Sequence, residues 1–342
     1  MRQEQRRNVR AGGLGKNCHL RVEPEPWCAV LRFFLMTAET TTLRAESLAS
    51  GHGWSVLDVV CTAGPHNRPF EERHQTFSLS LVVDGTFQYR SRQGSVLLAP
   101  GAVLLGNVGD CFECGHEHGT GDRCLSVQFD PGYWEDLVAA VAGARTTRFD
   151  APRVPPAPAL LASVASLCTA RAVGGSALEE AALEFAASVL RTAGGLRGVG
   201  RGASPRDERR ITEAVRSIAD KAHDLECADL SLGSLARKAG MTPYHFLRTF
   251  RSVVGMTPYQ YILHTRMTRA AARLRSSADS ISDIAYEAGF NDLSTFNRRF
   301  RRLLGASPGR YRERAKGAAS LPAAEERRAG SCGVARLRPR NP

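Results

Sequence analysis

Apolar residues recur at helical spacing near the end of the chain, between Ser280 and Lys316. A first short helix is indicated by apolar residues at i, i+3 and i+4: Ile281, Ile284 and Ala285. A second is indicated by apolar residues at i, i+4 and i+7: Phe296, Phe300 and Leu303. Gly289 stands between the two patterns, where a left-handed turn costs a glycine little. The pattern therefore predicts two helices joined by a glycine turn.

The same pattern occurs earlier in the chain, about 50 residues upstream. There Gly240 closes a short helix, and Thr242 and Pro243 cap and open the next one. Phe246 and Phe250 supply the inner face of that second helix. The two segments read LARKAG-MTPYHFLRTFRSVVGMTPYQY and IAYEAG-FNDLSTFNRRFRRLLGASPGRY, and both keep a closing Gly-x-Ser/Thr-Pro-x-x-Tyr. Two copies of one pattern form an internal repeat.

The outer face of the last predicted helix is polar and basic. It carries Ser294, Thr295, Asn297, Arg298, Arg299, Arg301 and Arg302. Hydroxyl and amide groups suit base edges, and arginines suit guanine or phosphate. A surface helix with solvated charge is the alternative interpretation. Because the pattern is repeated, we favour a pair of helix-turn-helix units.

These residues closely resemble the AraC/XylS family of bacterial transcription regulators. The resemblance covers residues 206–314, and its most specific positions are Ile284-Ala285, Gly289-Phe290, Ser294, Phe296, Phe300, Gly305, Ser307-Pro308 and Tyr311-Arg312. It implies two helix-turn-helix units joined by a long helix. In this chain the joining helix is expected from Pro258 to Leu274.

On this resemblance, the second helix of each unit is expected to enter the major groove of DNA, in segments about 34 Å apart. Base contacts are expected from Tyr244, His245, Leu247 and Arg248 in the first unit and from Leu293, Ser294, Thr295, Asn297 and Arg298 in the second. Phosphate contacts are expected from Arg251, Arg301 and Arg302, which flank these positions. The expected partners are double-stranded DNA and RNA polymerase.

Between residues 41 and 150 the pattern changes to short runs of β-type residues. Strands are predicted at 54–60, 77–83, 86–90, 95–99, 103–105 and 124–129. Turns are predicted at Asp84-Gly85, Gln93-Gly94 and Pro100-Gly101, and Asp-Gly favours a hairpin. Such strands predict a small antiparallel barrel or jelly roll, and the family resemblance implies a cupin-like domain that binds an effector. The predicted fold class is α+β: an N-terminal cupin-like antiparallel β-barrel followed by an all-α domain with two helix-turn-helix units.

Four side chains of metal-ligand type lie within eleven residues of this domain: Cys114, His116, His118 and Cys124. On a strand the first three would share one face, and Zn(II) binds such Cys/His sets, although iron or copper also fit. The alternatives are a polar loop with incidental His and Cys, and a thiol pair that oxidises. His66 and His74, which flank Glu71-Glu72, are further candidates for a pocket or metal site.

Charge separates the two halves of the chain. Residues 231–316 carry 16 Lys and Arg against 5 Asp and Glu, a net +11, whereas residues 41–150 carry 8 against 13, a net −5. A basic half of this kind indicates a polyanion as its partner. The sequence has no apolar run of about 18 residues, so no membrane span is predicted. Nine cysteines without a secretion signal predict a reduced, cytoplasmic protein.

The predicted organisation has five segments. They are a poorly ordered extension (1–40, with Met36 as an alternative start), a sensor domain (41–150), a linker region (151–204), a DNA-binding domain (205–316) and a disordered tail (317–342). The linker region holds predicted helices at 159–168 and 177–190, followed by a glycine-rich hinge at 194–202. These helices form either a homodimer surface or a layer on the barrel.

The predicted function is sequence-specific DNA binding by a non-enzymatic transcription regulator, an activator that responds to a small molecule or a metal. A cupin-type metalloenzyme with an accessory basic domain is the alternative. Its acid–base candidates are Glu113 and Glu117. A nucleoid protein is disfavoured, because both predicted recognition helices carry polar residues suited to base edges.

Overall fold

A domain of β-sheets precedes a helical domain, in the order that the sequence predicts. The computed structural model describes residues 42–117, 119–144, 147–194, 196, 203–221 and 229–319. The predicted extension at 1–40, most of the predicted hinge at 194–202 and the predicted tail from residue 320 lie outside the described residues.

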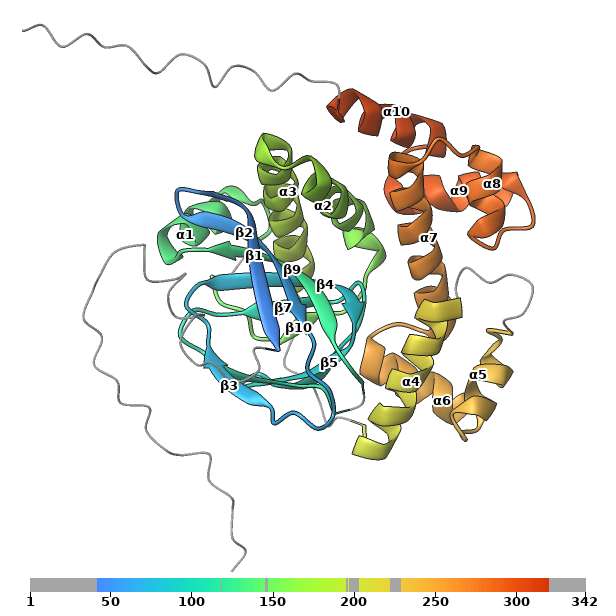
Figure 1. The fold of residues 1–342 in the computed structure, drawn as a ribbon, viewed down its shortest axis with the longest axis horizontal. Helices are drawn as coiled ribbons and strands as arrows, with labels where there is room; N and C mark the ends of the chain where they lie inside the picture. The colour runs from blue at the N-terminus through green and yellow to red at the C-terminus, as the bar shows by residue number, and fades with distance from the viewer. Residues whose placement is uncertain are drawn as a thin grey trace, which may run out of the picture. The chain divides into compact units, whose positions relative to one another are not determined.

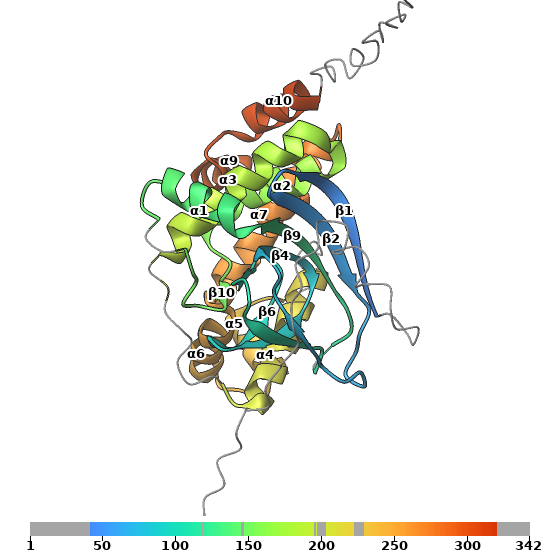
Figure 2. The same cartoon turned by 90° about the vertical axis from the view of Figure 1, so that its left-hand side faces the viewer.

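Two antiparallel sheets make up the first domain (Figures 1 and 2). The six-stranded sheet has the order β1 (Leu43–Gly51), β2 (Trp54–Cys61), β9 (Asp122–Phe129), β4 (Phe77–Gly85), β7 (Val103–Gly106) and β10 (Arg153–Val154). The four-stranded sheet has the order β3 (Phe70–Arg73), β8 (Cys111–Gly115), β5 (Phe87–Ser91) and β6 (Gly94–Leu98). The strands predicted from residue 54 to residue 129 are all present, whereas β1, β3, β8 and β10 were not predicted.

The cupin-like antiparallel fold is confirmed, but the strands of the described residues do not close into the predicted barrel. Asp84-Gly85 does not form the predicted hairpin, because β4 pairs with β7 and β9 while β5 pairs with β6 and β8. The register of β4 shifts between Val82 and Asp84, and Gly85 has a φ of +73°. The chain thus leaves one sheet and enters the other. The predicted turn at Gln93-Gly94 does join a hairpin, β5 to β6.

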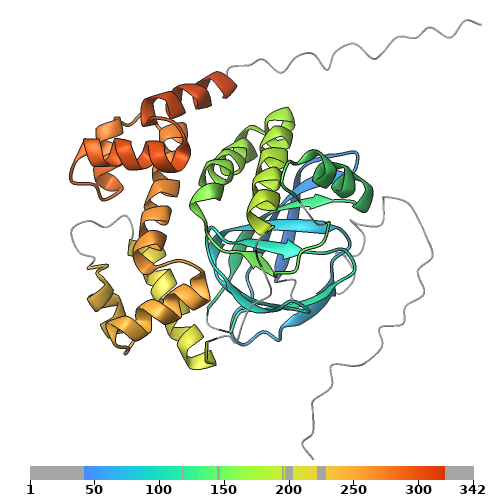
Figure 3. The same cartoon turned by 180° about the vertical axis from the view of Figure 1, so that it is seen from behind.

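Helices complete the apolar core of the sheet domain. The N-cap Asp130 starts α1 (Pro131–Ala140), which was not predicted and which buries Trp134. A single helical turn, η2 (Pro158–Leu160), leads into α2 (Leu161–Val173), which lies beside α3 (Gly175–Ala193) (Figure 3). The buried face of α3 consists of Leu178, Ala181, Ala182, Phe185, Ala186, Val189 and Leu190, and it belongs to the same cluster as the six-stranded sheet. Both predicted linker helices are therefore present and contribute to the core of this domain.

The helical domain contains the predicted repeat. Its helices are α4 (Pro205–Lys221), α5 (Leu232–Lys238), α6 (Pro243–Val254), α7 (Pro258–Ser276), α8 (Ile281–Glu287), α9 (Leu293–Leu304) and α10 (Pro308–Ala319). The long helix α7 runs from the α5–α6 pair to the α8–α9 pair (Figure 1). Its 19 residues span about 28 Å at the usual rise of an α-helix. Residues 317–319, predicted as tail, belong to α10. Among the described helices, none has the length and apolar character of a membrane span.

Buried residues of the sheet domain extend into the core of the helical domain. Leu97 of β6 and the adjacent Ala99 belong to one cluster with Ile211 of α4 and Phe250 of α6. Beside them, the buried Arg153 of β10 donates hydrogen bonds to two backbone carbonyls. One is that of Leu97, and the other is that of Val253 in α6, at 2.5 Å. Burial lowers the pKa of Arg153 to about 10, so the guanidinium is still charged at neutral pH.

Candidate nucleic-acid interface

A glycine in the left-handed region sets each turn between paired helices. Gly240, between α5 and α6, has a φ of +61°, and Gly289, between α8 and α9, has a φ of +82°. L-residues with a Cβ rarely adopt this conformation, so glycine fits both turns. The helix that follows each turn begins at a side-chain cap. Thr242 Oγ1 accepts from the His245 N–H at 3.4 Å, and Asp292 Oδ1 accepts from the Thr295 N–H at 2.7 Å.

Phenylalanine pairs fix the inner faces of α6 and α9. The ring centroids of Phe246 and Phe250 are 5.6 Å apart, and those of Phe296 and Phe300 are 5.4 Å apart. All four side chains are fully buried. Because residues four apart lie on the same face of a helix, burying these pairs turns the intervening polar residues outward.

All twelve residues predicted to contact DNA are accessible to solvent to some degree. The exposed ones are Tyr244, His245, Arg248, Arg251, Ser294, Arg298, Arg301 and Arg302. The half-buried ones are Leu247, Leu293, Thr295 and Asn297. Tyr244 is 70% exposed, which leaves its ring accessible to a partner. The structure thus places the predicted residues on two equivalent surface faces.

The exposed arginines of these two faces differ in their contacts. On α6, the Arg248 guanidinium lies 5.9 Å from the ring centroid of Tyr244. On α9, Arg298 Nη2 lies 3.5 Å from Thr295 Oγ1. Within the part of the chain that the structure describes, neither Arg301 nor Arg302 has an ion-pair or hydrogen-bond partner through its side chain. The face of α9 therefore presents cations that are not neutralised by neighbouring carboxylates.

A second basic group on α9 was not predicted to contact DNA. Arg299 donates a hydrogen bond to the Tyr259 hydroxyl of α7, and its guanidinium lies 6.0 Å from the Phe290 ring centroid. These residues line a cleft of about 270 Å³ between α7 and the turn from α8 to α9. The arginine is visible in the sequence as part of the polar face. Its pairing with Tyr259 depends on how α7 packs, which no local pattern reveals.

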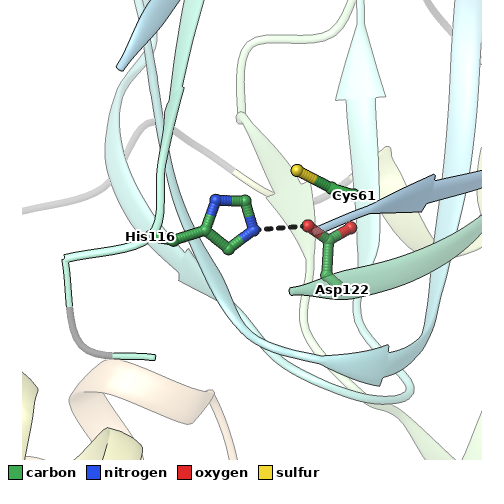
Figure 4. A group of neighbouring side chains, drawn as sticks. All are labelled: Cys61, His116 and Asp122. Atoms are coloured by element: carbon green, nitrogen blue, oxygen red, sulfur yellow. Dashed lines mark hydrogen bonds and ion pairs between the residues drawn. The ribbon is translucent and has the colours of Figure 1, made fainter. Parts of the chain in front are cut away.

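Two of the predicted metal ligands, His116 and Cys124, lie beside Asp122, which was not predicted, and His116 also lies near Cys61, which was not predicted either. Cys61, His116 and Asp122 each place one ligand atom within 4.8 Å of the others (Figure 4). His116 Nε2 lies 2.6 Å from Asp122 Oδ1. The buried thiol of Cys124 donates to Asp122 Oδ2 at 3.4 Å. Although burial lowers the pKa of His116, its hydrogen bonds with Asp122 and Cys61 raise that pKa to about 9.

The remaining candidates of the sheet domain have other surroundings. His118 lies outside the described residues, and His66 is exposed. Cys114 lies in β8, and burial raises the pKa of its thiol. His74 is buried against Tyr89, with its Nε2 2.9 Å from the hydroxyl.

The two carboxylates suggested as acid–base groups are engaged in ion pairs. Glu113 and Glu117 both pair with the Arg90 guanidinium. This geometry gives the metalloenzyme alternative no support.

Comparisons with known proteins identify both domains. Residues 235–314 match the family model of a helix-turn-helix domain, and residues 59–186 match that of an AraC-like ligand-binding domain. The transcriptional activator AarP of Providencia stuartii is 39% identical over 83 residues, which are 24% of this chain and 62% of AarP. The Tn10 TetD protein of Escherichia coli is 38% identical over 90 residues, 26% of this chain and 64% of TetD.

These matches cover only part of each protein. The chain matches between 29% and 64% of the length of the curated relatives. Among solved structures, an AraC-type regulator from Chromobacterium violaceum is 25% identical over 31% of this chain and 91% of its own, with a TM-score of 0.29. We base no conclusion on that structural likeness. The two domain matches together, in the order found here, show that the chain belongs to the AraC/XylS family of regulators.

Proposed function

We propose that this protein is a transcription regulator that binds specific duplex DNA through α6 and α9 and responds to a ligand of its sheet domain. The observation that carries the proposal is the duplicated interface. Two helices with matching caps, matching buried phenylalanines and exposed polar faces stand at opposite ends of one helix, α7. At about 28 Å, that helix is comparable in length to one turn of B-DNA, about 34 Å.

The division of labour within the interface follows from exposure and charge. Arg298, Ser294 and their counterparts on α6 are suited to base edges, because guanidinium and hydroxyl groups form hydrogen bonds there. Arg301 and Arg302 are suited to phosphates, which attract cations regardless of sequence. The named role of AarP supports activation as the sign of regulation. An activator of this kind would have RNA polymerase as a further partner.

The test is selection of bound duplexes from a random pool with the full-length protein. The affinity of the best duplex and of its scrambled form is then measured by fluorescence anisotropy over a range of salt concentrations. We expect the selected duplex to bind at least 1,000 times more tightly than the scrambled one, about the lower end for specific sites. Affinity should fall steeply with salt, because phosphate contacts release counterions.

Arg44→Ala is the matched control for charge. It removes one positive charge from an exposed position of β1, outside the helical domain, and should leave the affinity for the selected duplex unchanged. Arg301→Ala should lower it and make it less sensitive to salt. Equal affinity for selected and scrambled duplexes would contradict a sequence-specific regulator.

A further inference from the structure

We propose that the sheet domain binds one Zn(II) ion through Cys61, His116, Asp122 and Cys124. This inference rests on the proposed function, because it names a metal ion as the ligand to which the regulator responds. The set shares His116 and Cys124 with the group predicted from the sequence. It replaces the other two members with residues that strand pairing brings into place.

Strand pairing places three of these ligands on one face. Cys61 ends β2 and Asp122 begins β9, and the two are direct cross-strand partners. Opposed residues of an antiparallel pair project to the same face of the sheet. Cys124 lies two residues beyond Asp122 in β9 and therefore shares its face. Sheet pairing alone thus assembles two thiols and a carboxylate.

The fourth ligand comes from the opposite sheet. His116 directly follows β8 of the four-stranded sheet, and Figure 4 shows its imidazole directed at Asp122. The ligand atoms of Cys61, His116 and Asp122 lie within 4.8 Å of one another. In a tetrahedral zinc site, bonds of about 2.0–2.3 Å put ligand atoms roughly 3.3–3.8 Å apart. Shifts of about 1 Å or less would bring these three ligand atoms to that spacing, and the thiol of Cys124 reaches the group at Asp122 Oδ2, 3.4 Å away.

All four groups are withdrawn from solvent. Cys61, His116 and Cys124 are 4–5% exposed as residues, and the Asp122 side chain is 7% exposed. Burying a carboxylate and an imidazole carries a desolvation penalty of several kcal/mol that a close partner must offset. A divalent cation can provide that compensation for all four ligands at once.

The donor set selects the metal and the type of site. Thiolate and imidazole donors favour zinc over magnesium or calcium, which prefer oxygen. Four protein ligands fill a tetrahedral shell, so no coordination position remains for a substrate. Closed zinc sites of this kind stabilise structure and do not catalyse reactions. A site of this kind therefore does not fit a metalloenzyme, and it leaves zinc a structural or regulatory role.

The loop that carries His116 also contacts the helical domain. The guanidinium of Arg216, in α4, occupies the position that a Cβ on Gly119 would take. A hydrogen bond outside this loop also joins the sheet domain to α4: Gln88 Nε2 of β5 donates to Glu208 Oε2 at 3.2 Å. Gly119 is only three residues from His116, so we expect metal binding at that histidine to affect the contact of this loop with α4. This contact gives zinc a physical route to the helical domain.

The test begins with zinc alone, without DNA. Full-length protein is purified under reducing conditions without chelator, and its metals are measured by plasma mass spectrometry. We expect about one zinc per chain. Cobalt substituted for zinc should give the visible bands of a tetrahedral site and a thiolate-to-metal absorption. Cys61→Ser, Cys124→Ser and His116→Gln should each weaken zinc binding by more than about 100-fold, since even losing a partner of a ligand costs about 10–100-fold.

Two other cysteines supply matched controls. Cys111→Ser changes an exposed thiol at the start of β8, and Cys168→Ser changes a half-buried thiol of α2. Both variants should bind zinc like the unaltered protein. If a site variant fails to fold, as judged by circular dichroism, the site is tested instead by thiol protection in the unaltered protein. Bound zinc should protect the thiols of Cys61 and Cys124 from alkylation, and a chelator should remove that protection.

Three results would overturn the site: no zinc in any preparation, full zinc retention in the folded site variants, or a disulfide among these thiols with no metal bound. A second arm compares the affinity of zinc-loaded and chelator-treated protein for the selected duplex. We expect a change of at least about fivefold, the lower end of typical coupling between sites. Bound zinc with unchanged DNA affinity would overturn the role of zinc as the effector. Bound zinc without specific DNA binding would instead count against the proposed function.

Discussion

At the scale of single residues, two buried histidines of the sheet domain have pKa values shifted in opposite directions. His74 stacks on Phe112, with ring centroids 4.1 Å apart, and shares a hydrogen bond with the Tyr89 hydroxyl. Burial lowers the pKa of His74 to about 4, against a weaker opposing effect of the Asp110 charge. His116, which has a carboxylate partner, has its pKa raised to about 9. The ring of His74 is therefore neutral at pH 7, whereas the Asp122 carboxylate favours the charged form of His116 as long as no metal is bound.

His74 should make the protein acid-sensitive over a defined range of pH. Its folded pKa lies below the value near 6.5 of an unfolded histidine, so the unfolded chain gains the proton first as the pH falls. The stability contributed by neutral His74 is thus fully present above pH 6.5 and is lost between pH 6.5 and 4. We expect a slope of about 1.4 kcal/mol per pH unit within that range. This slope is measured by urea unfolding of the native protein and of His74→Gln between pH 7.5 and 4.5.

The stability difference between these two proteins should shrink as the pH falls, because only the native protein carries the buried ring. Among the described residues, burial also lowers the pKa of His264, but this residue is present in both proteins, so its contribution cancels in the difference. Parallel stability curves for the two proteins would show that His74 does not take up a proton over this range.

At the scale of elements, α6 and α9 are two versions of one structure. Each begins at a side-chain cap, buries a Phe pair four residues apart and ends at a glycine in the left-handed region, Gly255 or Gly305. These features lie within about a dozen residues of one another in sequence. For that reason the sequence alone predicts both helices and their exposed faces.

Opposite roles on one helix can be separated by two substitutions in α9. Arg298→Ala should reduce the affinity for the selected duplex by about 1–3 kcal/mol and relax the preference at one base pair, as expected for loss of a base contact. Arg302→Ala should weaken selected and scrambled duplexes equally and lower the salt dependence, as expected for loss of a phosphate contact. Competition anisotropy with single-base variants of the duplex measures both effects. If the two variants behaved alike, our assignment of roles within α9 would be wrong.

Pairing between distant strands is what the sequence leaves undetermined. The strand β1 has an almost wholly solvent-accessible pattern without apolar alternation, and β3 is the short, charged segment FEER. Neither carries a local signal of a strand. The proposed zinc ligands divide in the same way. His116 and Cys124 are found from their local spacing, whereas Cys61 and Asp122 meet only because β2 pairs with β9.

At the scale of the whole molecule, Arg153 links the sheet domain to the first helix-turn-helix unit. Its hydrogen bond to the Val253 carbonyl satisfies the last turn of α6, where carbonyls have no partner within the helix. A cation at this end of a helix also interacts favourably with the helix dipole. One buried side chain thus stabilises α6 from outside the helical domain.

Arg153→Met should loosen α6 selectively. Removing a charged donor from a buried carbonyl costs about 1.5–3 kcal/mol, so amide hydrogen exchange in α6 should accelerate roughly 10–100-fold. Exchange in α9, which has no contact with Arg153, should change little. Arg191→Met, at an exposed position of α3, is the matched control and should leave both helices unaffected. Equal acceleration in α6 and α9 would indicate general destabilisation and contradict a specific link.

The mixed cluster around Leu97 and Ala99 has a consequence for how the chain is made. These residues pack against α4 and α6, more than 100 positions later in the sequence. Contacts between such distant residues form slowly in a free chain, because closing a long loop costs entropy. A ribosome releases the N-terminal domain first. The sheet domain can therefore fold during synthesis and offer a finished apolar surface to α4 and α6 as they emerge. The order of translation itself then shortens the time needed to form these long-range contacts.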